Sequence, residues 1–180
     1  MKYRKVLQLV LAGALLVNLV GCASPANKDE MTPSDLVLGQ KFNATVQVKT
    51  AGGSETGAME GTNISDADLK AAIEQAISNT ELFNKVIQVG DANYLLAVSI
   101  TSLSKPVFGL TFTVNLETTW SLTNLTTKKV ELRKVVSSTG TATFGDAAIA
   151  VGRIQMAVER AAKQNISQGL TDVASLNLKK

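Results

Sequence analysis

From Leu110 to Thr123 the chain alternates between apolar and polar residues more clearly than anywhere else in its 180 residues. Successive side chains of a β-strand point to opposite sides of the sheet, so this pattern predicts a strand with one buried and one solvated face. Such strands are typical of antiparallel sheets, because parallel strands are usually covered on both sides. The inner face holds Leu110, Phe112, Val114, Leu116, Trp120 and Leu122. Trp120 is therefore expected in the core, and the threonine-rich outer face is expected to meet solvent or a partner.

Three other stretches predict strands. Residues 42–50 alternate in the same way, and residues 93–103 are typical of a central strand. Residues 130–143 predict another long strand, bent or bulged near Val135 and Val136, where the alternation slips.

The C-terminal part of the chain predicts a long amphipathic helix. Gly152 and Gly169 lower its helix propensity, so we expect fraying beyond Asn165. Its inner stripe is Ala150, Ile154, Ala157, Val158, Ala161 and Ile166, and its expected solvent side is Arg153, Glu159, Arg160, Lys163 and Gln164.

A shorter helix is predicted over residues 66–79, where Ser65 and Asp68 occupy the positions of a capping box. Two helices covering one face of the sheet is the economical packing of these elements. The sequence therefore predicts an α+β fold, an antiparallel sheet of about four strands with two helices on one face, as a two-layer sandwich.

The N-terminus predicts a targeting segment. Lys2, Arg4 and Lys5 form a basic start, residues 6–17 are nearly all apolar, and small residues lead to Cys22. This is the arrangement of a secretory signal peptide. A retained transmembrane anchor is the alternative, but the apolar stretch is shorter than the ~20 residues that a span requires.

Leu19, Val20, Gly21 and Cys22 resemble the lipobox of bacterial lipoproteins. This resemblance implies that residues 1–21 are a signal peptide and that Cys22 becomes a lipid-modified N-terminus, which attaches the chain to a membrane. In the sorting rule of that family, an aspartate after the cysteine retains the protein at the inner membrane, and this chain has Ala23. We therefore expect the outer membrane, on its periplasmic face.

The chain after Cys22 divides into a linker and one domain. Residues 22–40 contain two prolines and no periodic apolar pattern, which predicts a flexible tether. Residues 41–180 then form a single domain. Because three of the 18 basic residues lie in the signal segment, 15 remain against 15 acidic residues, and nothing in the charge favours a nucleic-acid partner.

The residue types argue against catalysis. The chain has no histidine, the commonest general base and metal ligand, and its one cysteine is assigned to the lipid. The glycine-rich residues 51–63 lack the Gly-Lys-Ser/Thr ending of a phosphate loop, and no G-x-S-x-G nucleophile elbow occurs. We expect no enzyme, no cofactor and no metal.

Two surfaces are candidates for binding. Lys128, Lys129, Arg133 and Lys134 form the end of a predicted hairpin, which would contact anionic lipid or polymer if it is more than a solvated turn. The threonine-rich sheet face and the sheet edges are the second candidate, because an edge strand can pair with a strand of another envelope protein.

The outline resembles small envelope lipoproteins such as the LPS-assembly lipoprotein, the fold at the start of the Tol-Pal β-propeller protein, and the curli-export lipoprotein. The resemblance rests on "SDADLKAAIEQAI", "ANYLLAVSI" and "AVERAAKQNI" and on the lipid anchor. It implies a non-catalytic accessory or assembly factor that contacts an envelope protein. The alternatives are a lipid- or glycolipid-binding protein, which would need an apolar cavity between helices and sheet, and a surface-held enzyme inhibitor.

Overall fold

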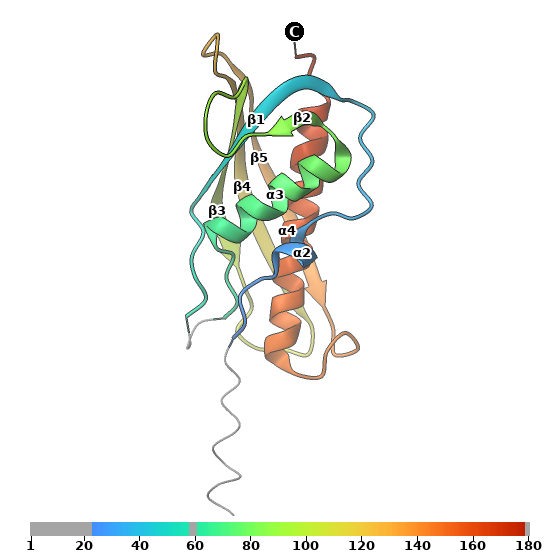
Figure 1. Cartoon of the computed structure of the whole chain (residues 1–180). Helices are drawn as coiled ribbons and strands as arrows, with labels where there is room; N and C mark the ends of the chain where they lie inside the picture. Colours follow the sequence, from blue (N-terminus) through green and yellow to red (C-terminus); the bar gives the residue numbers. More distant parts are fainter. Residues whose placement is uncertain (1–22, 58–60, 179–180) are drawn as a thin grey trace, which may run out of the picture.

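The computed structural model describes residues 23–57 and 61–178. Within these ranges, five strands form one sheet and the helices lie against one of its faces (Figure 1). In chain order the elements are α2 (Lys28–Met31), β1 (Phe42–Ala51), α3 (Asp66–Thr80), β2 (Phe83–Val86), β3 (Tyr94–Ser104), β4 (Phe112–Asn124), β5 (Val130–Ala142) and α4 (Ala150–Ala174). The predicted α+β class is confirmed.

The sheet is mixed rather than antiparallel, and its strand order is β2-β1-β3-β4-β5. Strands β3, β4 and β5 are antiparallel, but β1 runs parallel to both β2 and β3. The expected sheet of about four antiparallel strands is therefore wrong in detail. Helix α3 returns the chain so that β2 runs parallel to β1, as crossovers through a helix do. Because β2 pairs with the first half of β1 and β3 with the second half, the short link 87–93 can cross between them.

The core lies between the sheet and the helices. Helix α3 packs on β1 and β2, and α4 packs on β4 and β5. Side chains of every strand are buried there, and Trp120 is completely buried as predicted. The backbones also approach closely, because a Cβ added at Gly140 of β5 would lie 2.0 Å from the carbonyl oxygen of Ala157 in α4. Only a glycine at this point lets the helix lie directly on the strand.

The predicted start of α3 is confirmed. The hydroxyl of Ser65 accepts a hydrogen bond from the amide of Asp68 at 3.0 Å and donates one to its carboxylate at 2.6 Å. Asp66 accepts from the amide of Gly53 at 2.8 Å. The free amide groups of the helix start are thus partly satisfied by the chain itself.

Helix α4 does not fray beyond Asn165 but continues to Ala174. Gly169 is buried beside Trp120, whose ring leaves no room for a Cβ, since the nearest ring carbon would lie 2.3 Å from it. The side chain of Asn165 accepts hydrogen bonds from Thr118 Oγ1 (2.6 Å) and Trp120 Nε1 (3.2 Å), and it donates to the carbonyl of Val136 (3.0 Å). Close packing and buried hydrogen bonds therefore hold the second half of α4.

Much of the segment expected to be a flexible tether belongs to the domain. Residues 28–31 form α2, which packs between α3 and α4, and Met31 is completely buried. The amide of Ala26 donates to the carbonyl of Asn63 at 3.2 Å, and the hydroxyl of Thr62 donates to the carbonyl of Ser24 at 2.8 Å. A helix of four residues is too short for periodicity to reveal, and its burial depends on residues distant in the sequence.

Two details of the long strands differ from expectation. Strand β4 begins at Phe112, so Leu110 lies outside it and is 74% exposed. The pairing of β5 with β4 is regular through Val135 and Val136, and the register shifts instead near Val130. Val135 breaks the expected alternation because it is an apolar residue on the open face of the sheet, 55% exposed.

Candidate functional site

The outer edge of β5 is the longest free edge of the sheet. Strand β5 lies at one end of the strand order, and β2 at the other end has only four residues. Near the end of β5, helix α4 covers the edge: the amide of Thr139 donates to Gln164 Oε1 at 3.0 Å, and Arg160 Nη1 donates to the carbonyl of Thr141 at 2.6 Å. These contacts show that the backbone groups of odd-numbered residues in β5 point away from β4.

The first half of β5 has no such cover from α4. By the same alternation, the backbone groups of Arg133, Val135 and Ser137 point outward, and among the described residues α4 places no hydrogen-bonding side chain on them. An edge of unpaired amides and carbonyls is a ready template for another strand.

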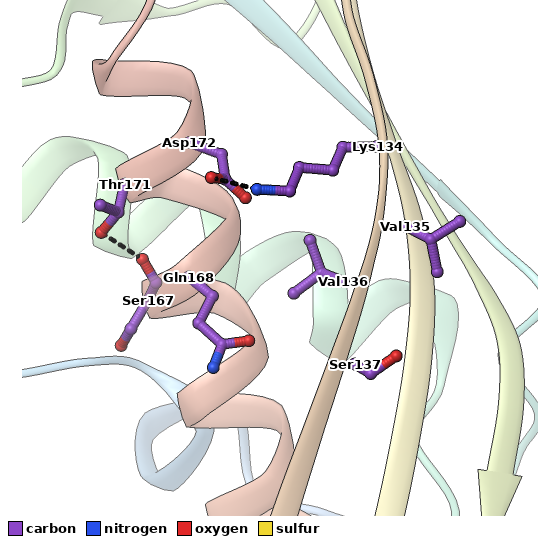
Figure 2. A pocket seen from close by; sticks show the side chains of 8 residues that line it. All are labelled: Lys134, Val135, Val136, Ser137, Ser167, Gln168, Thr171 and Asp172. Carbon is purple, nitrogen blue, oxygen red and sulfur yellow. Dashed lines mark hydrogen bonds and ion pairs between the residues drawn. The ribbon is translucent and has the colours of Figure 1, made fainter.

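A groove of about 360 Å³ lies beside this open half of the edge, between β5 and α4. In Figure 2, Lys134 and Val136 point from β5 toward the helix, while Val135 points away from it. Lys134 Nζ lies 2.6 Å from Asp172 Oδ1 of α4, so this ion pair closes one end of the groove. The groove is lined by Lys134, Val135, Val136, Ser137, Ser167, Gln168, Thr171 and Asp172. A strand added to the β5 edge would lay its inner side chains against this flank of α4.

The four basic residues singled out in the sequence do not form one patch. Lys128 stands in the β4–β5 turn with a positive φ of 61°, and Lys129 is paired with Glu131 at 2.7 Å. Lys134 points toward α4 and is paired with Asp172, whereas Arg133 lies on the open face of the sheet. The structure thus brings only Lys134 into the groove, and a shared anion site for all four is not formed.

An ion pair fixes the opposite end of β5 to α4. Arg160 Nη2 lies 2.8 Å from Asp146 Oδ1, and the amide of Thr143 donates to Asp146 Oδ2 at 2.7 Å. These hydrogen bonds, first that of Arg160, hold the pKa of Asp146 well below its usual value. The pKa of Arg160 is raised for the same reason. The strand is therefore held firmly where its edge is covered.

Two charged residues assigned to the solvent side of the last helix are buried. Arg153 is 4% exposed and donates from Nη1 to the carbonyls of Ala147 and Ala148, both at 2.8 Å. Glu159 is 6% exposed and accepts from the amide of Asn27 at 2.9 Å. Glu159 also accepts from Gln155 Nε2 of its own helix at 3.0 Å, but the contacts with the loop and the N-terminal segment join residues that no pattern within the helix could have brought together.

No group of three or more His, Cys, Asp or Glu that could hold a metal ion occurs in residues 23–57 and 61–178. Cys22, the predicted lipidation site, and the predicted signal peptide lie outside the described residues. Within those residues, no helix combines the length and the apolar character that crossing a bilayer requires.

Comparison with known proteins identifies the fold. No family model matches the chain, and no curated protein matches it in sequence. A crystal structure from Xanthomonas campestris, described as family DUF330, has a TM-score of 0.60 and 11% identity, covering 84% of this chain and 92% of that one. A hypothetical protein from Chlamydia trachomatis has a TM-score of 0.56 and 7% identity, covering 74% and 96%. A minor lipoprotein from Acinetobacter baumannii matches with a TM-score of 0.43 and 9% identity, covering 78% and 98%. The chain therefore shares the fold of the first two proteins, at identities that say nothing of its function.

Proposed function

We propose that this chain is a lipid-anchored protein of the bacterial cell envelope, which acts without catalysis by binding another envelope protein at the open half of the β5 edge. The lipid is carried by Cys22, and the outer membrane, on its periplasmic face, is the proposed location. The observation that carries the protein-binding part is the uncovered edge of residues 133–137 beside the groove of Figure 2.

The packing of the core supports protein binding over binding of a lipid within the domain. An acyl chain would need an apolar space between helices and sheet. That layer is filled at the points where α4 crosses the sheet: Trp120 is completely buried, and neither Gly140 nor Gly169 leaves room for one more carbon atom. The groove beside β5 is open to solvent and suits an added strand.

The test places a photo-crosslinking amino acid at Gln168, a groove residue on α4, in cells that carry the full chain. Replacing Val135 by proline removes an outward amide from the edge while leaving the pairing with β4 intact, because proline is tolerated where no ladder bond is lost. Val135→Thr keeps the amide and serves as the matched control.

We expect one envelope protein to crosslink in the parent and in Val135→Thr, and to be lost in Val135→Pro. A crosslinked glycolipid in place of a protein would favour the lipid-binding alternative. Equal capture in all three variants, or no capture in any, would contradict strand addition at this edge.

The anchoring part has its own test. Cys22→Ser should leave an unprocessed precursor without lipid, because no other cysteine is present in the chain. Metabolic labelling with a fatty acid, followed by separation of the two membranes, measures both lipidation and location. A normally processed, fatty-acid-labelled Cys22→Ser protein would refute the lipobox assignment.

A further inference from the structure

Large apolar side chains are exposed mainly at one end of the molecule. Five of the nine such residues in the described part of the chain lie in the β3–β4 loop, residues 105–111, or in the β5–α4 loop, residues 143–149. They are Val107 (88% exposed), Phe108 (88%), Leu110 (74%), Phe144 (60%) and Ile149 (73%). We call these two segments the apolar loop pair.

The two loops are held together by a buried cation. Strand β4 starts opposite the end of β5, with Phe112 paired to Ala142, so the loops emerge side by side. The guanidinium of Arg153 stacks on the rings of Phe112 and Phe144, 5.2 and 5.5 Å from their centroids. It also donates to the carbonyl of Gly109 at 3.5 Å and to two carbonyls of the second loop. The exposed apolar side chains thus belong to a fixed surface.

The described chain begins beside this surface. In Figure 1 its first residues lie at the lower end of the molecule together with both loops, while the C-terminus lies at the opposite end. Lys105, at the start of the first loop, donates to the carbonyl of Thr62 at 2.9 Å, and Thr62 in turn donates to the carbonyl of Ser24. The N-terminal segment is therefore attached to the same end of the domain as the apolar loop pair.

The short distance along the chain from Ser24 to Cys22 limits how far the domain can stand from its anchor. Two extended residues span at most about 7 Å, since the chain advances ~3.3–3.6 Å per residue. A flexible tether over residues 22–40 would have let the domain move freely relative to its anchor. The hydrogen bonds of Ser24 and Ala26 to Thr62 and Asn63 instead attach the start of this segment to the domain. A lipid on Cys22 would hold this end of the domain at the bilayer surface.

We propose that the apolar loop pair is a membrane-contacting surface, whose exposed side chains enter the interfacial region of the bilayer to which the chain is anchored. This inference rests on the proposed lipid anchor. The transfer of apolar side chains out of water is favourable, and Phe and Leu are among the residues that interfacial segments bury at the boundary between headgroups and acyl chains. The contact fixes the orientation of the domain, with the β4–β5 turn directed away from the membrane.

The experiment uses the full lipidated chain in vesicles of phosphatidylethanolamine and phosphatidylglycerol that contain a lipid-borne nitroxide quencher. Phe108→Cys carries an environment-sensitive fluorophore in the first loop. Val89→Cys is the matched control, since Val89 is 91% exposed in the link between β2 and β3, at the other end of the molecule. Far-UV circular dichroism verifies that both labelled chains are folded, and the parent chain is treated with the same label.

We expect lipid quenching to be several-fold stronger at Phe108→Cys than at Val89→Cys, with a blue-shifted emission only at the former. Equal quenching at both positions, with an unlabelled parent chain, would overturn this inference and leave the anchor intact. A blue shift at Phe108→Cys without quenching would indicate a protein contact, and it would also overturn the inference. Labelling of the parent chain would show that the sulfur of Cys22 is free, which overturns the proposed anchor and the membrane surface that depends on it.

Discussion

Replacing Gly169 by alanine tests whether helix α4 and the sheet are packed as closely as the structure indicates. Both Gly152 and Gly169 lie within α4, and each should favour helix formation when changed to alanine, by up to about 1 kcal/mol. The two positions differ in their surroundings. A Cβ at Gly152 would lie 3.6 Å from Ala147 Cβ, an ordinary contact, whereas a Cβ at Gly169 would lie 2.3 Å from Trp120 Cε2.

The magnitude follows from that distance. Carbon atoms in contact are normally ~3.5–4.0 Å apart, so the Trp120 ring or the helix must move by more than about 1 Å. Overpacking of this kind costs about 1–3 kcal/mol. The ring resists the movement because its Nε1 donates to Thr118 Oγ1 at 2.9 Å. With the gain of about 1 kcal/mol in helix propensity subtracted from the middle of that range, Gly169→Ala should destabilise the domain by about 1 kcal/mol, while Gly152→Ala should stabilise it by roughly 0.5–1 kcal/mol.

Urea unfolding measures both variants against the parent. Far-UV circular dichroism reports the fold, and the fluorescence of Trp120, the only tryptophan, reports its surroundings. With a slope of about 1–3 kcal/mol per molar urea, the midpoint of Gly169→Ala should fall by about 0.5 M and that of Gly152→Ala should rise slightly. If both substitutions stabilised the domain equally, α4 could not pack as closely on Trp120 as the structure indicates. That result would favour a helix that frays beyond Asn165, as expected from the sequence.

Four further substitutions test other parts of the structure. Met31→Ala should lower the free energy of unfolding by about 2–5 kcal/mol because Met31 is completely buried. An unchanged urea midpoint would show that residues 22–40 form a flexible tether after all. Asp146→Asn should lower the stability of the domain at neutral pH. Because the folded-state pKa of Asp146 lies below its unfolded value of about 3.9, the difference in thermal midpoint between parent and variant should shrink as the pH falls below that value. A pH-independent difference in thermal midpoint would exclude the ion pair with Arg160 as its cause. Ile73→Asp should abolish folding, as judged by circular dichroism, whereas the half-buried Ile154→Asp should be milder, and the reverse order would contradict the helix faces.

The sequence predicts those features that depend on neighbouring residues. The alternation in β4 reveals its buried face, and Ser65 with Asp68 reveals the start of α3, because both signals are local. Strand β2 has four residues, too few for an alternation to show, and the parallel pairing of β1 depends on where the crossover through α3 returns.

The candidate site was predictable only in general terms. An edge strand with lysines near a hairpin can be expected from the sequence, but which half of β5 is covered depends on Gln164 and Arg160, side chains of a helix that begins after the strand ends. Arg153 and Glu159 show the same limitation. Charged residues are normally placed on the solvent side of a helix, and only the folded structure shows that the β5–α4 loop and the N-terminal segment before α2 supply hydrogen-bond partners for these two.

The two proposed surfaces are compatible because they lie toward different ends of β5. The strand begins at the β4–β5 turn and ends at the loop of residues 143–149, which belongs to the apolar loop pair. Its covered half, where Gln164 and Arg160 bind the edge, is the half nearer those loops. The open half, residues 133–137, is nearer the turn. If the apolar loop pair rests on the bilayer, the edge available for another strand is on the side away from the lipid. A partner would then reach the groove without displacing the membrane contact, and loss of one interaction should leave the other unchanged.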